Sequence, residues 1–86
     1  MEDYIATFFS HFGAMAFKKK CDKEGYPAVI MPVPRNLSSS CGTCVKFLLE
    51  EDIEQFVQSG IFDEDVDTVY LVEDDSYTPV YQNHIR

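Results

Sequence analysis

The sequence predicts a single α+β domain of the ferredoxin-like type. In this two-layer sandwich an antiparallel sheet carries two helices on one face, in the order βαββαβ. Segments typical of strands alternate in that order with two segments whose apolar residues recur at helical spacing. The 86 residues are 45% hydrophobic, which suffices for one core and one domain. We expect this domain to span residues 1–75, followed at 76–86 by a C-terminal tail or an extra edge strand.

The N-terminal part is expected to form a strand and then a helix. Residues 4–9 are short, apolar and aromatic, as strands often are. Ser10 offers a side-chain acceptor for the first turn of a helix, and Gly25 marks the end of that helix. The apolar residues between them recur at helical spacing: Ala14, Phe17 and Cys21.

Two further strands are expected in the middle of the chain. Residues 28–33 form a continuous apolar run, typical of a strand that is covered on both faces or lies at the centre of a sheet. Pro32 and Pro34 end this strand, because proline cannot donate a hydrogen bond to a ladder. Residues 43–48 then form the next strand.

The last two elements are a second helix and a fourth strand. Asp52 lies three residues before Gln55, the spacing of a capping box, with aspartate at the cap position. The apolar stripe that follows consists of Ile53, Phe56 and Val57. Gly60 ends this helix, and residues 68–72 form the strand.

Charge and hydropathy restrict the classes of partner. Residues 1–47 carry four acidic and six basic residues, whereas residues 48–86 carry eleven acidic residues and one basic residue. Nucleic acid is therefore not an expected partner, since phosphate binding needs a basic face. A run of about 20 apolar residues, as needed to cross a membrane, does not occur, and the N-terminus does not resemble a signal peptide. We expect a cytoplasmic protein without a membrane partner.

Most of the candidate chemistry lies between Arg35 and Cys44. Cys41 and Cys44 are three residues apart in this stretch. The thiolate is the reactive form of cysteine, and hydroxyls, turn N–H groups and a nearby cation stabilise anionic sulfur. Gly42 allows a positive φ or a close backbone approach. The candidate reacting thiols are Cys41 and Cys44. The candidate anion-binding residues are Arg35, Ser38, Ser39, Ser40 and Gly42.

Three motifs together resemble the selenium/sulfur carrier-like family, a group of small bacterial proteins that share a domain of unknown function. These are Tyr4-Ile5-Ala6-Thr7-Phe8, Met31-Pro32-Val33-Pro34-Arg35 and Leu37-Ser38-Ser39-Ser40-Cys41-Gly42. The likeness extends from about Tyr4 to Val72. It implies that Cys41 is the key thiol of a carrier rather than of an enzyme, with sulfur or selenium donor and acceptor proteins as partners and no cofactor. The resemblance does not cover Cys44.

Alternatives to a carrier remain open at this point. A dithiol redox pair would require a turn between Cys41 and Cys44, because residues three apart in an extended strand are about 10 Å apart and a disulfide needs about 7 Å or less. Two thiolates are half of a zinc site, but His11 and His84 have no diagnostic spacing, so no metal is expected. A small interaction module with incidental thiols is a further alternative.

Three further expectations concern Cys21, His11 and the oligomeric state. We expect Cys21 to be a buried small hydrophobic residue. His11 is expected on the surface, with a position near the cysteine turn as the alternative. The aromatic residues leave the formation of a homodimer open.

Overall fold

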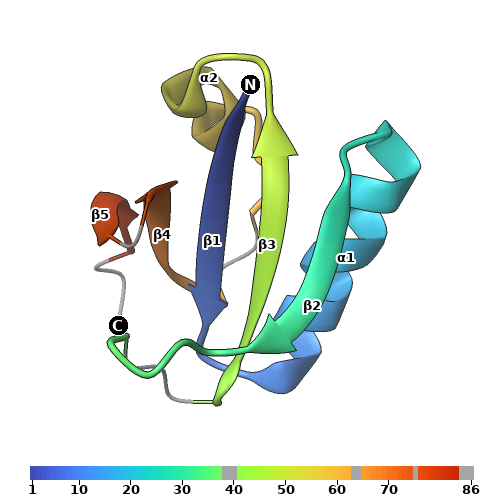
Figure 1. Ribbon diagram of the computed structural model, residues 1–86. Coiled ribbons are helices and arrows are strands. Elements are labelled where there is room, and N and C mark those ends of the chain that lie inside the picture. Colours follow the sequence, from blue (N-terminus) through green and yellow to red (C-terminus); the bar gives the residue numbers. More distant parts are fainter. Residues whose placement is uncertain (38–40, 63–64, 75, 84–86) are drawn as a thin grey trace.

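The computed structural model describes residues 1–37, 41–62, 65–74 and 76–83. It confirms an α+β fold with an antiparallel sheet and two helices (Figure 1). The sheet has five strands, one more than the four of the predicted order. The elements are β1 (Glu2–Phe8), α1 (His11–Glu24), β2 (Ala28–Pro32), β3 (Thr43–Leu49), α2 (Ile53–Gln58), β4 (Val66–Glu73) and β5 (Ser76–Gln82).

The strands lie in the order β2-β3-β1-β4-β5, and each neighbouring pair is antiparallel. Because β1 and β2 are both antiparallel to β3, they run in the same direction on either side of it, and α1 connects them. In the central register Tyr4 lies opposite Phe47 on β3 and Leu71 on β4. This topology brings the end of β1, the start of α1 and the start of β3 to the same end of the sheet.

The helix boundaries follow from the capping residues that the sequence indicated. Ser10 Oγ accepts a hydrogen bond from Gly13 N at 3.0 Å, and Gly25 ends α1 with φ 86°. Asp52 Oδ1 accepts from Glu54 N at 3.1 Å at the start of α2. At the other end of α2, Ser59 is the C-cap residue, and Gly60 follows it with φ 82°. The predicted starts and ends of both helices are therefore confirmed to within one residue.

One face of the sheet carries the hydrophobic core and both helices. Phe17 of α1 has its ring centroid 5.2 Å from that of Phe47 on β3 and 6.3 Å from that of Phe56 on α2. The Phe47 and Phe56 rings stack at 5.3 Å. Tyr4 and Phe8 of the central strand belong to the same cluster. Aromatic burial of this extent is a dominant source of stability in so small a domain.

The opposite sheet face carries no helix among the described residues, yet part of it is buried. Ile5, Thr7 and Cys44 alternate with the core residues along β1 and β3 and are at most 2% exposed. Thr7 Oγ1 donates to Thr68 O at 3.3 Å on this face. In the view of Figure 1, the segment after β2 passes across this end of the sheet.

The expectation that residues 28–33 form a covered or central strand is wrong. The topology places β2 at the edge of the sheet, with β3 on one side. Val29 is 58% exposed and Ile30 is 36% exposed. An apolar run that predicts a buried strand is thus an edge strand here, because α1 shields only part of one of its faces. At the other edge, β5 extends the sheet beside β4.

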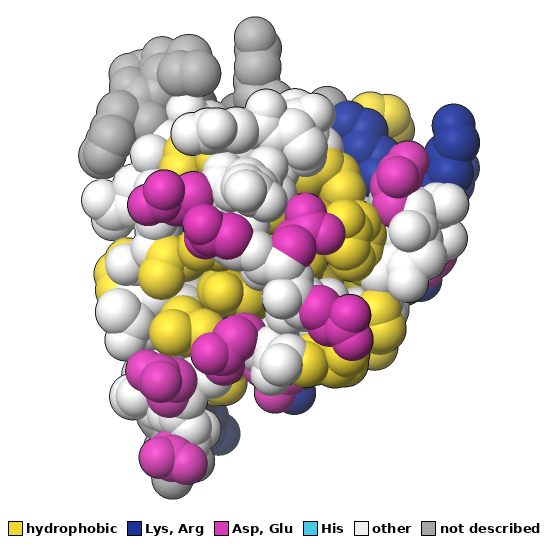
Figure 2. Space-filling model, turned by 90° about the horizontal axis from the view of Figure 1, so that it is seen from above, with side chains coloured by type: hydrophobic (Ala, Val, Ile, Leu, Met, Phe, Trp, Pro, Cys, Tyr) yellow, Lys and Arg dark blue, Asp and Glu magenta, His cyan; other side chains and the backbone are white. Residues whose placement is uncertain are grey.

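Charge is separated over the surface. Figure 2 shows acidic side chains spread over the end of the molecule where α2 lies, while most of the Lys and Arg side chains in view lie at one edge. The acidic side chains at this end include the exposed Glu50, Glu51, Asp52 and Glu54. Within the described residues, no helix is both long enough and apolar enough to cross a membrane.

Candidate functional site

The cysteine-bearing connection between β2 and β3 lies where β1 ends and α1 begins. Val33 N donates to Gly42 O at 3.2 Å, which continues the pairing of β2 and β3 by one step. Gly42 has φ 73°, so the expected positive φ is confirmed. The chain thus turns sharply between Cys41 and the first residue of β3.

The Cys41 side chain lies between two strands of the sheet. Its Sγ donates toward Phe8 O, 3.3 Å away at the end of β1, and toward Thr43 O, 3.4 Å away at the start of β3. Cys41 is partly exposed and packs against the core cluster on the helix side of the sheet. The thiol hydrogen is therefore held at the sheet end, while part of the side chain faces solvent.

Cys44 has a different environment, because the register directs it to the face opposite the helices. It lies beside Thr7 on β1 and Met31 on β2 and is 0% exposed. Its Sγ lies 3.7 Å from Pro32 O, to which it donates. Burial, with a smaller contribution from the nearby Cys41 thiol, raises the pKa of Cys44 to about 11.

Cys21 is buried in the core on α1, as expected, and is 0% exposed. Burial and the neighbouring Asp22 carboxylate raise the pKa of this thiol to about 12, although Lys18 opposes the effect. Of the three cysteines, all of which lie within the described residues, Cys41 alone is partly exposed. It is the thiol that a protein or small reagent reaches first.

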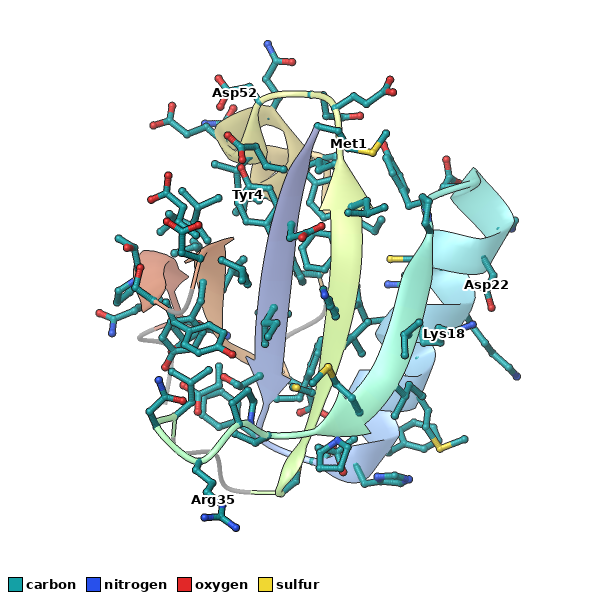
Figure 3. All side chains as sticks on the ribbon, in the orientation of Figure 1. Met1, Tyr4, Lys18, Asp22, Arg35 and Asp52 are labelled. Carbon is teal, nitrogen blue, oxygen red and sulfur yellow. The ribbon has the colours of Figure 1, made fainter. Side chains whose placement is uncertain are left out.

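The remaining candidate residues differ in how the structure places them. Arg35 is exposed in the same connection, and Figure 3 shows its side chain pointing away from the sheet. Gly42 adjoins Cys41 directly. Ser38, Ser39 and Ser40 lie outside the described residues, so the predicted hydroxyl cluster is not tested.

Two residues at this end of the sheet were largely missed from the sequence. His11, the first residue of α1, has Nδ1 hydrogen-bonded to Thr43 Oγ1 at 3.2 Å, and Thr43 also supplies a carbonyl to Cys41. The imidazole is exposed, as expected, and it lies near the cysteine turn, which was the alternative. Its position directly after a helix cap at the end of a strand was the signal for this placement.

Asp65, the second of these residues, lies against the start of α1. Its Oδ2 accepts from Ser10 Oγ at 2.6 Å, and its carbonyl accepts from Phe9 N at 2.7 Å. A Cβ at Gly13 would lie 2.5 Å from Asp65 Cβ, so the contact requires glycine there. The sequence indicated this only through a glycine in the first turn of a helix. The carboxylate occupies the helix start, which is therefore no site for anionic sulfur.

The described residues do not form a cluster of metal ligands. Within these ranges, no three His, Cys, Asp or Glu side chains are grouped so that they could hold a metal ion. Cys44 faces away from the helix side, and Cys21 lies within the core. The described residues therefore offer one accessible thiol, with backbone carbonyls and an imidazole near its turn.

These features define a small α+β protein with one accessible thiol on a turn at the end of its sheet. Residues 3–67 match the family described as "Putative Se/S carrier protein-like". Because the match covers most of the chain, the protein belongs to this family, and the resemblance inferred from the sequence is confirmed. No curated protein and no solved structure matches the chain.

Proposed function

We propose that this protein is a non-enzymatic carrier that holds a sulfur or selenium atom on Cys41 and delivers it to an acceptor protein. Membership of the carrier-like family supports this function in general terms. The observation that carries the assignment to Cys41 is the contrast among the thiols. Cys41 is partly exposed, whereas Cys44 and Cys21 are buried.

For sulfur, the proposed step is an exchange between a persulfide and a thiolate. The Cys41 thiolate attacks the terminal sulfur of a donor protein's persulfide. One sulfur–sulfur bond forms, the donor's sulfur–sulfur bond breaks, and the donor leaves as a thiolate. Cys41 then carries the persulfide, which an acceptor thiolate takes in the same way. No external oxidant or reductant is needed, because the sulfane sulfur moves between thiols without net electron gain or loss.

The surroundings of Cys41 suit temporary storage of the cargo. The carbonyls of Phe8 and Thr43 accept the thiol hydrogen and hold the sulfur at the sheet end before loading. We propose that Arg35, the backbone at Gly42 and the serines 38–40 stabilise the anionic persulfide, since cations and N–H or O–H donors favour charged sulfur. Support for these roles comes from the nearness of these residues to Cys41 in the sequence.

The geometry favours a single-thiol carrier over a dithiol redox pair. A resolving cysteine must become a thiolate and reach the first sulfur. Cys44 is buried on the opposite sheet face from the core against which Cys41 packs, and its pKa is raised to about 11. We therefore infer that Cys44 is not required for loading or release.

Two further features, the fold arrangement and the cellular location, belong to the proposal. We infer that the strand order β4-β1-β3-β2 is a ferredoxin-like arrangement to which β5 is added. We also infer a cytoplasmic location, because a persulfide carrier needs a reducing compartment in which its thiols persist.

The test is intact-mass analysis of the reduced protein after incubation with a cysteine desulfurase and cysteine. The expected result is a gain of one sulfur atom that is lost on reduction. The Cys41→Ser variant should gain nothing, while Cys44→Ser and Cys21→Ser should load as the wild type does. Loading that survives Cys41→Ser would refute the assignment. Loss of two hydrogens on mild oxidation, in place of a sulfur gain, would indicate a dithiol pair instead.

A further inference from the structure

We propose that two copies of this chain associate through their β2 strands, so that the two sheets join into one continuous antiparallel sheet. The inference goes beyond the proposed carrier function and does not depend on it. It rests on three observations: the open edge of β2, the pattern of backbone groups on that edge, and the charges beside it.

The first observation is that the edge is open and carries no charge. In the described part of the chain, no strand lies on the outer side of β2. Edge strands are often blunted by charged residues or by proline, which hinder pairing with another chain, and Pro32 stands only at the last position of β2. No charged residue occurs from Tyr26 to Pro34, in a chain of net charge −8. Val29, near the centre of this edge, is 58% exposed.

The second observation concerns the backbone groups that point outward. Leu48 N donates to Pro27 O, and Val33 N donates to Gly42 O, so the odd-numbered residues of β2 point toward β3. The alternation of an antiparallel ladder then directs the N–H and C=O groups of Ala28 and Ile30 outward. A two-fold axis at Val29 places Ala28 opposite the partner's Ile30, and Ile30 opposite the partner's Ala28.

This register uses every outward donor of the strand interior. Each of the two Ala28–Ile30 pairs exchanges two backbone hydrogen bonds, which gives about four across the interface. Proline lacks an N–H, but Pro32 would lie opposite Tyr26, whose N–H already donates to Cys21 O. The edge is therefore complementary to itself, as a two-fold interface requires.

The third observation is the charge pair that flanks this edge. Lys18 and Asp22 of α1 lie beside β2 in Figure 3, with Lys18 Nζ 2.7 Å from Asp22 Oδ2. A two-fold axis reverses the direction of the second α1. Lys18 of one copy then faces Asp22 of the other, so that opposite charges meet on the helix side of the joined sheet.

The proposed interface leaves the thiol site open. In an antiparallel pair of β2 strands, the two C-terminal ends of β2 lie at opposite ends of the interface. Each of these ends leads into a cysteine-bearing connection, so the two Cys41 side chains are held apart. Sulfur loading and dimer formation are thus separable properties.

The test is sedimentation equilibrium of the reduced protein up to about 1 mM, a range that suits a small interface. The expected mass rises with concentration toward twice the 9.9 kDa of one chain. Val29→Lys places two lysines face to face and should abolish this rise. Val80→Lys is the matched control, because Val80 is also an exposed valine on an edge strand, β5 at the other side of the sheet, and is 39% exposed. A constant mass of one chain, or a dimer that survives Val29→Lys, would overturn the proposal.

A cross-linking measurement tests the register independently. At the proposed two-fold axis, Val29 of one chain lies opposite Val29 of the other, and these two residues do not hydrogen-bond to each other. The Cα atoms of such a pair lie about 4.5 Å apart, which is within the range for a disulfide. In a Cys41→Ser background, Val29→Cys should form a disulfide-linked dimer on mild oxidation. Ile30→Cys in the same background should give at least tenfold less of this dimer. Equal cross-linking at the two positions in proteins with wild-type circular dichroism would refute the register.

Discussion

Alkylation of the reduced, folded protein should modify Cys41 and spare the other two thiols. An ordinary thiol with a pKa of about 8.5 is about one quarter thiolate at pH 8. A pKa of about 11 leaves Cys44 about one thousandth thiolate, and a pKa of about 12 leaves Cys21 about one ten-thousandth. The expected rates are therefore lower than that of an ordinary thiol by about 200-fold and about 2,000-fold, respectively. Burial slows both reactions further, because the reagent must reach the sulfur.

The assay is a time course with iodoacetamide at pH 8, followed by intact mass and peptide mapping. One group should be added to the folded chain, and three should be added in urea, where the burial of Cys44 and Cys21 is lost. The Cys41→Ser variant should remain unlabelled while it is folded. The reasoning is wrong if Cys44 in the folded wild type reacts within tenfold of free glutathione.

Three further predictions concern stability. Gly13→Ala should lower the free energy of unfolding by about 1–3 kcal/mol in urea titrations, because its Cβ would meet Asp65 Cβ at 2.5 Å. In an Asp65→Gly background, which has already lost the Ser10–Asp65 hydrogen bond, the same substitution should cost much less, and an equal cost in both backgrounds would refute the contact. Stability should fall as pH rises above about 8.5 toward 11, because the folded pKa of Cys44 is raised and its neutral form is favoured. The slope should reach about 1.4 kcal/mol per pH unit for each of the two buried thiols, Cys44 and Cys21, so Cys44→Ala should remove about half of it. Phe17→Ala should cost about 3–5 kcal/mol in thermal or urea unfolding, since its ring contacts both β3 and α2; a loss below 1 kcal/mol would contradict the described core.

The carrier proposal places different demands on the two neighbouring cysteines. Cys41 must be reached by a donor and then by an acceptor, and its partly exposed position on a turn meets this requirement. Cys44, one residue into β3, is held within the sheet and contributes packing beside Thr7 and Met31. Two thiols that look like a pair in the sequence are therefore expected to have separate roles.

Local signals were sufficient for the elements of the fold. The side chains of Ser10 and Asp52 cap helices within three residues of their own positions, and Gly25 ends α1 in the left-handed region. Short apolar and aromatic runs identified the strands, and Gly42 adopts the positive φ that its type allows. Such features depend on backbone sterics and on groups a few residues apart, so they can be inferred from short stretches of sequence.

The surroundings of each residue depended on pairing between distant segments. The apolar run 28–33 suggested a buried strand, yet β2 became an edge because β3, rather than β2, pairs with β1. A strand alternates its faces with every residue, so the register with β1 and β2 determined that Cys44 is buried opposite the helices.

The sequence by itself determined the α+β class, the family and the stretch that holds the candidate thiol. Only the tertiary structure distinguished the exposed Cys41 from the buried Cys44, and only it brought His11 to Thr43 and Asp65 to Ser10. The physical reason is that burial and pKa depend on neighbours brought together across 30 to 60 residues of chain by the sheet register, and a local pattern of residue types carries no record of that register.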